Sequence, residues 1–149
     1  MATFISHNPQ ETEAFGRRLG ERLEAGAVLA LSGDLGAGKT RLVQGVAVGL
    51  GISGRVQSPT FALVNVHEGG RLPLYHIDVY RLDTVAQIQG AGLEDYLQTD
   101  GVTMIEWAER WFGDGAGDGT GDGARFFKTI RLEVVSETVR RIIYEGFGD

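Results

Sequence analysis

The sequence contains no cysteine, which excludes disulfide bonds and thiolate metal sites. Its three histidines, His7, His67 and His76, lack the spacing of a paired imidazole ligand set. Positive charge is also scarce, because 14 Lys and Arg residues stand against 20 Asp and Glu residues, a net charge of −6. This balance disfavours binding to nucleic acid through released counterions, so any role with RNA is expected to run through a partner.

Long apolar runs are absent as well. No segment approaches the roughly 18 apolar residues that a membrane span needs. The first residues have neither a basic start nor the apolar core of a secretory signal. We therefore expect a cytoplasmic protein that does not bind a membrane, built as a single domain over residues 1–149.

The chain does contain a phosphate-binding loop. Residues 33–40 read Gly-Asp-Leu-Gly-Ala-Gly-Lys-Thr and match the pattern G-x-x-x-x-G-K-[ST]. In this pattern the glycines let the backbone wrap phosphate oxygens, Lys39 reaches the terminal phosphates, and the Thr40 hydroxyl is a ligand of Mg²⁺. The sequence therefore predicts a nucleoside triphosphate site, with Mg²⁺ as the only implied metal.

The flanking segments supply the strand and the helix that this loop requires. The apolar run 27–32 precedes it, and apolar residues with helical spacing follow it until the glycines at 49 and 51. Asn8 and Pro9 predict the start of an earlier helix that reaches about Ala25. Further expected elements are a hairpin over 61–77, short helices after Thr84 and at 92–97, a strand at 102–105, and a hairpin of strands 125–135 and 139–145 at the sheet edge. Together they predict a three-layer α/β fold of the P-loop type, with a mainly parallel sheet and antiparallel additions.

Residues 113–123 alternate glycine with aspartate and other small residues. This composition predicts a flexible loop, since ordering so many glycines is entropically costly. A calcium site is disfavoured, because the segment lacks the aspartate spacing of an EF-hand and the apolar position of a nonapeptide β-roll.

Two acids are candidates for binding Mg²⁺ or positioning water next to the phosphates. Glu106 ends the most apolar strand, the usual place for a carboxylate that holds Mg²⁺, while Asp78 ends the strand before it. One of them could bind the metal while the other positions water, or each could be a solvated or capping acid. Thr60 is a candidate for a switch hydroxyl that senses the γ-phosphate.

Four motifs follow one another along the chain: the phosphate loop, Ser58-Pro59-Thr60-Phe61, Tyr75-His76-x-Asp78-x-Tyr80-Arg81-Leu82, and Ile105-Glu106-Trp107. Together with Gly-Leu-Glu-Asp-Tyr at 92–96, they resemble the TsaE (YjeE) family over almost the whole chain. The resemblance implies a P-loop ATPase that works with TsaD and TsaB. Their product is N6-threonylcarbamoyladenosine at position 37 of bacterial tRNAs that read ANN codons.

The resemblance also implies roles for individual residues. Mg²⁺ is assigned to Thr40 and Glu106, Asp78 lies near the reacting phosphate, and Thr60 belongs to a switch. Trp107 either contacts the nucleotide or is a core or interface residue. Two departures are Ala108, where the family often has proline, and the loop 113–123. The nucleotide is assigned to Gly33, Asp34, Leu35, Gly36, Ala37, Gly38, Lys39, Thr40 and Arg41, and less firmly to Pro9 through Thr12 and to Arg140 or Arg141.

No intrinsic arginine finger is evident, so slow ATP hydrolysis alone and faster hydrolysis with partners is expected, with Lys39, Asp78, Glu106 and Thr60 as the catalytic group. A small P-loop kinase is an alternative, but the loop 113–123 carries no arginine for a lid. A GTPase is less favoured, because no Asn-Lys-x-Asp segment is present. A third alternative is a nucleotide-gated binding module in which hydrolysis is incidental.

Overall fold

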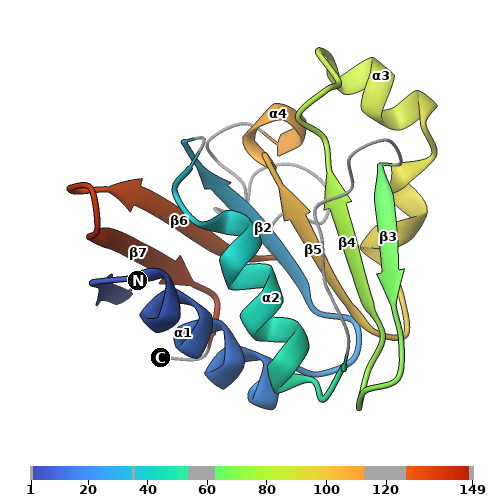
Figure 1. Cartoon of the computed structure of the whole chain (residues 1–149). Helices are drawn as coiled ribbons and strands as arrows, with labels where there is room; N and C mark the ends of the chain where they lie inside the picture. Colours follow the sequence, from blue (N-terminus) through green and yellow to red (C-terminus); the bar gives the residue numbers. More distant parts are fainter. Residues whose placement is uncertain (1, 35, 54–62, 113–126, 148–149) are drawn as a thin grey trace.

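The computed structural model describes residues 2–34, 36–53, 63–112 and 127–147, which form one seven-stranded sheet with helices on both faces (Figure 1). The order of the strands is β1-β7-β6-β2-β5-β4-β3. The strands are β1 (Ala2–Ser6), β2 (Val28–Gly33), β3 (Val64–His67), β4 (Leu74–Asp78), β5 (Val102–Glu106), β6 (Lys128–Val134) and β7 (Arg140–Glu145). The helices are α1 (Pro9–Arg22), α2 (Lys39–Gly49), α3 (Val85–Gly90) and α4 (Glu109–Phe112), with a 3-10 segment η1 (Leu93–Leu97).

The centre of the sheet is parallel and its margins are antiparallel. Strand β2 pairs in parallel with β5 and β6, and β5 pairs in parallel with β4. The antiparallel pairs are β3 with β4, β6 with β7, and β1 with β7. The predicted α/β fold with antiparallel additions is therefore confirmed.

Two expectations need correction, one about the edge of the sheet and one about the end of α1. The C-terminal hairpin joins the sheet beside β2 but does not form its edge, because β1 pairs with β7 from Ala2 opposite Tyr144 to Ser6 opposite Arg140. Helix α1 ends at Arg22 and not near Ala25, because Leu23 is already extended (ψ 145°) and its side chain is buried in the core. The expected loop 113–123 and the start of the hairpin at 61–62 lie outside the described residues.

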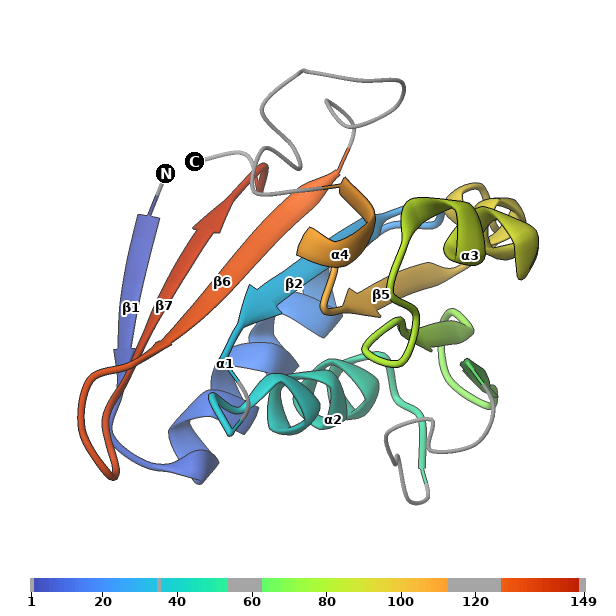
Figure 2. The ribbon, with the colours of Figure 1, turned by 90° about the horizontal axis from the view of Figure 1, so that it is seen from above.

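Both faces of the sheet are covered, which makes the fold three layers deep. Figure 2 shows α1 and α2 on one face and α3 and α4 on the other. Within β2, Leu29 and Leu31 pack toward α1 and α2, whereas Val28 and Ala30 pack toward the opposite helices. Burial on both faces explains why this strand is an unbroken apolar run in the sequence.

Glycines bring α1 and α2 unusually close together. A Cβ atom at Gly45 would lie 2.1 Å from the carbonyl oxygen of Glu13, and one at Gly20 would lie 2.3 Å from that of Val46. The two backbones therefore touch where side chains would normally separate them. Since α2 begins at Lys39, this contact helps to set the position of the phosphate loop. No helix in the described ranges is long and apolar enough to cross a membrane.

Candidate functional site

The phosphate loop connects the end of β2 to the start of α2, as the sequence predicts. Gly33 has φ 135°, and a Cβ atom there would lie 2.3 Å from the carbonyl oxygen of Leu132. Gly38 has φ 104° and precedes α2 without a side-chain cap. A glycine-rich loop that leads into a helix N-terminus with no side-chain cap is the usual arrangement of an anion site.

A cavity of about 330 Å³ lies over this turn. It brings the loop together with the carboxyl ends of β4 and β5, where Asp78 pairs with Glu106 across the two parallel strands. Crevices at the carboxyl ends of parallel strands are the common ligand sites of open α/β sheets. The lining residues are Gly36, Ala37, Gly38, Lys39, Thr40, Arg41, Asp78, Tyr80, Glu106 and Trp107.

Thr40 and Glu106, which were predicted as metal ligands, are in contact. The Thr40 hydroxyl donates to both carboxylate oxygens of Glu106, each at 3.4 Å. Glu106 is buried, and Nε2 of the fully buried His76 is hydrogen-bonded to its Oε2. A hydroxyl and a carboxylate suit Mg²⁺, which usually takes few protein ligands and completes its shell with phosphate and water oxygens. No group of three or more His, Asp or Glu side chains suited to a metal occurs among the described residues.

Burial perturbs both Lys39 and Asp78. Desolvation lowers the pKa of Lys39, and nearby carboxylates, Glu109 and Glu106 foremost, counteract part of that effect. Desolvation also raises the pKa of Asp78, although its carboxylate accepts a hydrogen bond of 2.9 Å from the Tyr80 amide. A buried lysine and a partly buried acid with perturbed pKa values, in one cavity, are typical of a functional site.

Trp107 is part of this site. The Lys39 ammonium donates to the carbonyl oxygens of Gly33 and Asp34 and lies 3.7 Å from the centroid of the Trp107 ring system. Trp107 has φ 61° and is the only residue other than glycine with a positive φ in the described part of the chain. Such strain persists where surrounding contacts impose it, and here the Tyr80 ring lies 4.8 Å from the Trp107 ring.

The remaining residues assigned to the nucleotide or to catalysis differ in how close they lie to the phosphate loop. Arg140 donates to the Gly36 carbonyl oxygen at 3.2 Å, so it lies against the loop, whereas Arg141 pairs with Glu133 at 3.1 Å. Thr12 is buried beside the loop, since its methyl would be 3.8 Å from a Cβ atom at Gly38. Pro9 is exposed and does not line the cavity. Leu35 and Thr60 lie outside the described residues.

Two residues near the site had no role predicted from the sequence. His76 holds the second oxygen of Glu106, and Glu109 places Oε2 3.5 Å from the Gly33 amide nitrogen. His76 lies two residues before Asp78 in a motif that the sequence displays, and Glu109 follows Glu106 by three residues. Nothing in that spacing distinguishes these two residues from ordinary polar residues, so only the folded geometry identifies them.

Comparison with known proteins gives consistent results. The family model described as "Threonylcarbamoyl adenosine biosynthesis protein TsaE" matches residues 6–141. A protein of that name from Nostoc sp. is 48% identical over 114 residues, which cover 74% of this chain and 70% of the relative. The one from Mycobacterium bovis is 36% identical over 148 residues, covering 93% and 83%.

Coverage is shorter for other relatives. The matches to the Synechocystis and Bacillus subtilis proteins of the same name, at 47% and 46% identity, span 66% and 68% of this chain but only 65% and 63% of those proteins. A solved structure titled "Crystal structure of Bacillus subtilus YdiB" superposes with a TM-score of 0.77 at 31% identity, covering 99% of this chain and 86% of the other. With a family model matched over most of its length and a phosphate loop set against Glu106, the chain belongs to the TsaE family, whose members take part in the biosynthesis of threonylcarbamoyladenosine in tRNA.

Proposed function

We propose that this chain binds and hydrolyses ATP with Mg²⁺ at the phosphate-loop cavity, in the service of tRNA threonylcarbamoyladenosine formation. The observation that carries the proposal is the contact of Thr40 with Glu106 directly beside Lys39. A hydroxyl from the loop and a carboxylate from a neighbouring strand are the usual protein ligands of Mg²⁺ in P-loop NTPases. Bound Mg²⁺ would neutralise charge on the phosphate oxygens.

The roles of the protein groups follow from their positions. The uncapped amides of α2 and the Lys39 ammonium bind phosphate oxygens, for which Lys39 leaves its carbonyl partners in the loop. Because Glu106 contacts Thr40, we assign Glu106 to the metal and Asp78 to the orientation of the attacking water. The raised pKa of Asp78 makes it a better proton acceptor than an exposed aspartate.

His76 is a positioning residue for Glu106. It is fully buried, its Nε2 is bonded to Oε2 of Glu106, and its Nδ1 has no partner among the described residues. This pattern fits a neutral imidazole that donates through Nε2, because a proton on Nδ1 would be buried without an acceptor. His76 thereby holds Oε2, and Oε1, which accepts a hydrogen bond from the Thr40 hydroxyl, is the oxygen that would turn toward Mg²⁺.

Replacing His76 by phenylalanine is expected to raise the Mg²⁺ concentration for half-maximal ATP hydrolysis by about 10- to 100-fold, the usual effect of losing a partner of a metal ligand. The ring keeps its volume, so the loss comes from the hydrogen bond and not from a cavity. Titration of hydrolysis with Mg²⁺ measures the shift. His67→Phe is the matched control, because no carboxylate in the described part of the chain forms an ion pair with His67. An unchanged half-saturation for His76→Phe would contradict the positioning role.

Replacing Asp78 by asparagine is expected to lower ATP turnover by about 100-fold or more if Asp78 orients water. The same change is expected to increase the free energy of unfolding at neutral pH, because burial raises the pKa of Asp78 and its charge is therefore costly. Asparagine keeps an acceptor for the Tyr80 amide. As pH falls through the folded pKa toward the lower unfolded value, the wild type gains stability and the advantage of asparagine shrinks.

Urea unfolding of both proteins at neutral pH and at about pH 4 measures this difference. A variant that is less stable than the wild type at neutral pH would show that the carboxylate is stabilised where it lies. A variant with wild-type turnover would remove Asp78 from the reaction.

We further propose that TsaD and TsaB are the partners and that this chain reaches tRNA only through them. ATP hydrolysis resets the complex for threonylcarbamoyl transfer to adenosine 37 of ANN-reading tRNAs. The net charge of −6 supports contact with proteins and not with tRNA itself. The test is ATP turnover of the chain alone and with TsaB and TsaD from the same source. Turnover that rises with the partners supports the proposal, and equal turnover contradicts it.

A further inference from the structure

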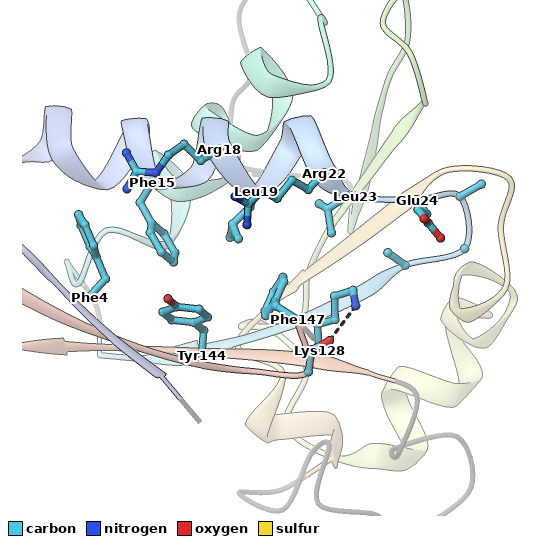
Figure 3. Close-up of a pocket in the computed structure, with 14 residues that line it drawn as sticks. Phe4, Phe15, Arg18, Leu19, Arg22, Leu23, Glu24, Lys128, Tyr144 and Phe147 are labelled. Carbon is cyan, nitrogen blue, oxygen red and sulfur yellow. Dashed lines mark hydrogen bonds between the residues drawn. The ribbon is translucent and has the colours of Figure 1, made fainter. Parts of the chain in front are cut away.

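A second cavity, of about 650 Å³, lies between the C-terminal half of α1 and the ends of β6 and β7 (Figure 3). It shares no lining residue with the phosphate-loop cavity. Its size is within the usual range of small-molecule sites, roughly 300–1,000 Å³. Nothing in the proposed ATPase uses it.

Aromatic and aliphatic side chains form its apolar wall. Figure 3 shows Leu19 of α1, and Leu23 just after the helix, facing Tyr144 and Phe147 across the cavity. Phe15 closes one end, with its ring centroid 5.1 Å from that of Tyr144. The rings pack on one another and on the sheet, but they do not fill the space beneath the helix.

Small residues explain why the space remains. The chain leaves α1 through Ala25, Gly26 and Ala27, and Gly146 lies on the other side of the cavity. Gly26 has φ 92°, and a Cβ atom there would meet no heavy atom within 4 Å. Residues 25–27 therefore place no large side chain in the space between Leu23 and Phe147.

Unpaired positive charge gathers at the rim. Arg18, Arg22 and Lys128 line the cavity against one acid, Glu24. Among the described residues none of the three has a carboxylate within 4.0 Å, whereas Arg141 on the surface of the same sheet pairs with Glu133.

Two of these cations contact neutral groups. Arg18 lies 5.4 Å from the Phe4 ring centroid, and Lys128 donates to the carbonyl oxygen of Gly146 at 2.8 Å. Three cations against one acid around this cavity reverse the balance of the whole chain, in which 14 Lys and Arg residues stand against 20 Asp and Glu residues.

We infer that this cavity binds a small organic anion: a carboxylate, sulfonate or phosphate carried on an aliphatic or planar apolar body. The apolar body would pack between Leu19, Leu23 and Phe147, and the charged group would be held at the rim by the arginines and Lys128. A nucleic acid strand fits less well, because the rest of the surface would repel a polyanion. The site is independent of the proposed ATPase.

The probe for this inference is 8-anilinonaphthalene-1-sulfonate, whose fluorescence rises in apolar surroundings. We expect one molecule to bind per chain and hexanoate to displace it. Hexanol lacks the charge and acetate lacks the apolar body, so neither should displace it at the same concentration. Displacement by hexanol would show that the site recognises only the apolar body. Displacement by acetate would show that it recognises only the charge. Either result overturns the proposed class of ligand.

Charge reversal locates the bound probe. The double variant Arg18→Glu/Arg22→Glu is expected to weaken probe binding by about tenfold or more. Arg17→Glu, on the same helix but outside the cavity, should leave binding unchanged. Ala27→Phe should block binding by filling the cavity, with thermal melting to check the fold. If Ala27→Phe does not fold, the test rests on Arg18→Glu/Arg22→Glu, in which both replaced side chains are exposed. Wild-type affinity for the probe in that double variant would overturn the inference.

Lys39→Ala separates this site from the nucleotide site. It should leave probe binding unchanged while it lowers ATP turnover by roughly 100- to 1,000-fold, so failure of one proposal is distinguishable from failure of the other. Loss of probe binding in Lys39→Ala would place the probe in the phosphate-loop cavity and would contradict a separate site.

Discussion

ATP turnover by Lys39→Ala is expected to fall by roughly 100- to 1,000-fold, as when one donor that stabilises transition-state charge is removed. Lys39 is buried at the start of α2, and it is the only lysine among the described residues that line the cavity. Its side chain is free to exchange carbonyl acceptors for phosphate oxygens without a change in the helix that carries it. Steady-state phosphate release measures the effect.

Arg17→Ala is the control for Lys39→Ala, because Arg17 is exposed, pairs with Glu21 on α1 and does not line the cavity. It should retain wild-type turnover. If Lys39→Ala folds normally and also retains wild-type turnover, hydrolysis does not take place at the phosphate loop. The proposal that Thr40 and Glu106 bind Mg²⁺ for hydrolysis would then be wrong.

The largest effect on stability is expected from Gly45→Ala, which should lower the free energy of unfolding by about 3 kcal/mol. The added Cβ would lie 2.1 Å from the carbonyl oxygen of Glu13, so α1 and α2 must move apart. Backbone atoms cannot rotate away as the end of a side chain can. Since the same helix begins at Lys39, ATP affinity should fall together with stability.

Urea unfolding of Gly45→Ala and of Gly90→Ala makes this comparison. Gly90 lies in α3, and a Cβ atom there would meet nothing within 4 Å. Its replacement should change stability by less than about 1 kcal/mol, toward greater stability, because alanine favours a helix. Equal small effects at both positions would contradict the close contact of the two helices.

Local features of the site could be predicted from the sequence. The phosphate loop is recognisable because glycines, Lys39 and Thr40 must follow one another at fixed spacing, and Glu106 stands out because a carboxylate ends an apolar strand. The cap of α1 is equally local, with Asn8 accepting from the Glu11 amide at 2.8 Å. In each of these cases the physical cause lies within a few residues of the position that it explains.

Non-local features could not be predicted in this way. Strand β1 has only five residues, and its pairing with β7 joins the two ends of the described chain. The bond of His76 to Glu106 depends on β4 lying beside β5, and the approach of α1 to α2 depends on how two helices cross. Such relations follow from tertiary packing, which short-range patterns do not encode.

The most direct test is phosphate release by the wild type and by Glu106→Gln over a range of Mg²⁺ concentrations, with ATP binding measured alongside. Glutamine keeps the size of the side chain but removes the charge that would hold the metal. The proposed role of Glu106 predicts that the variant still binds ATP but loses Mg²⁺-dependent hydrolysis. Wild-type turnover with an unchanged dependence on Mg²⁺ would contradict it.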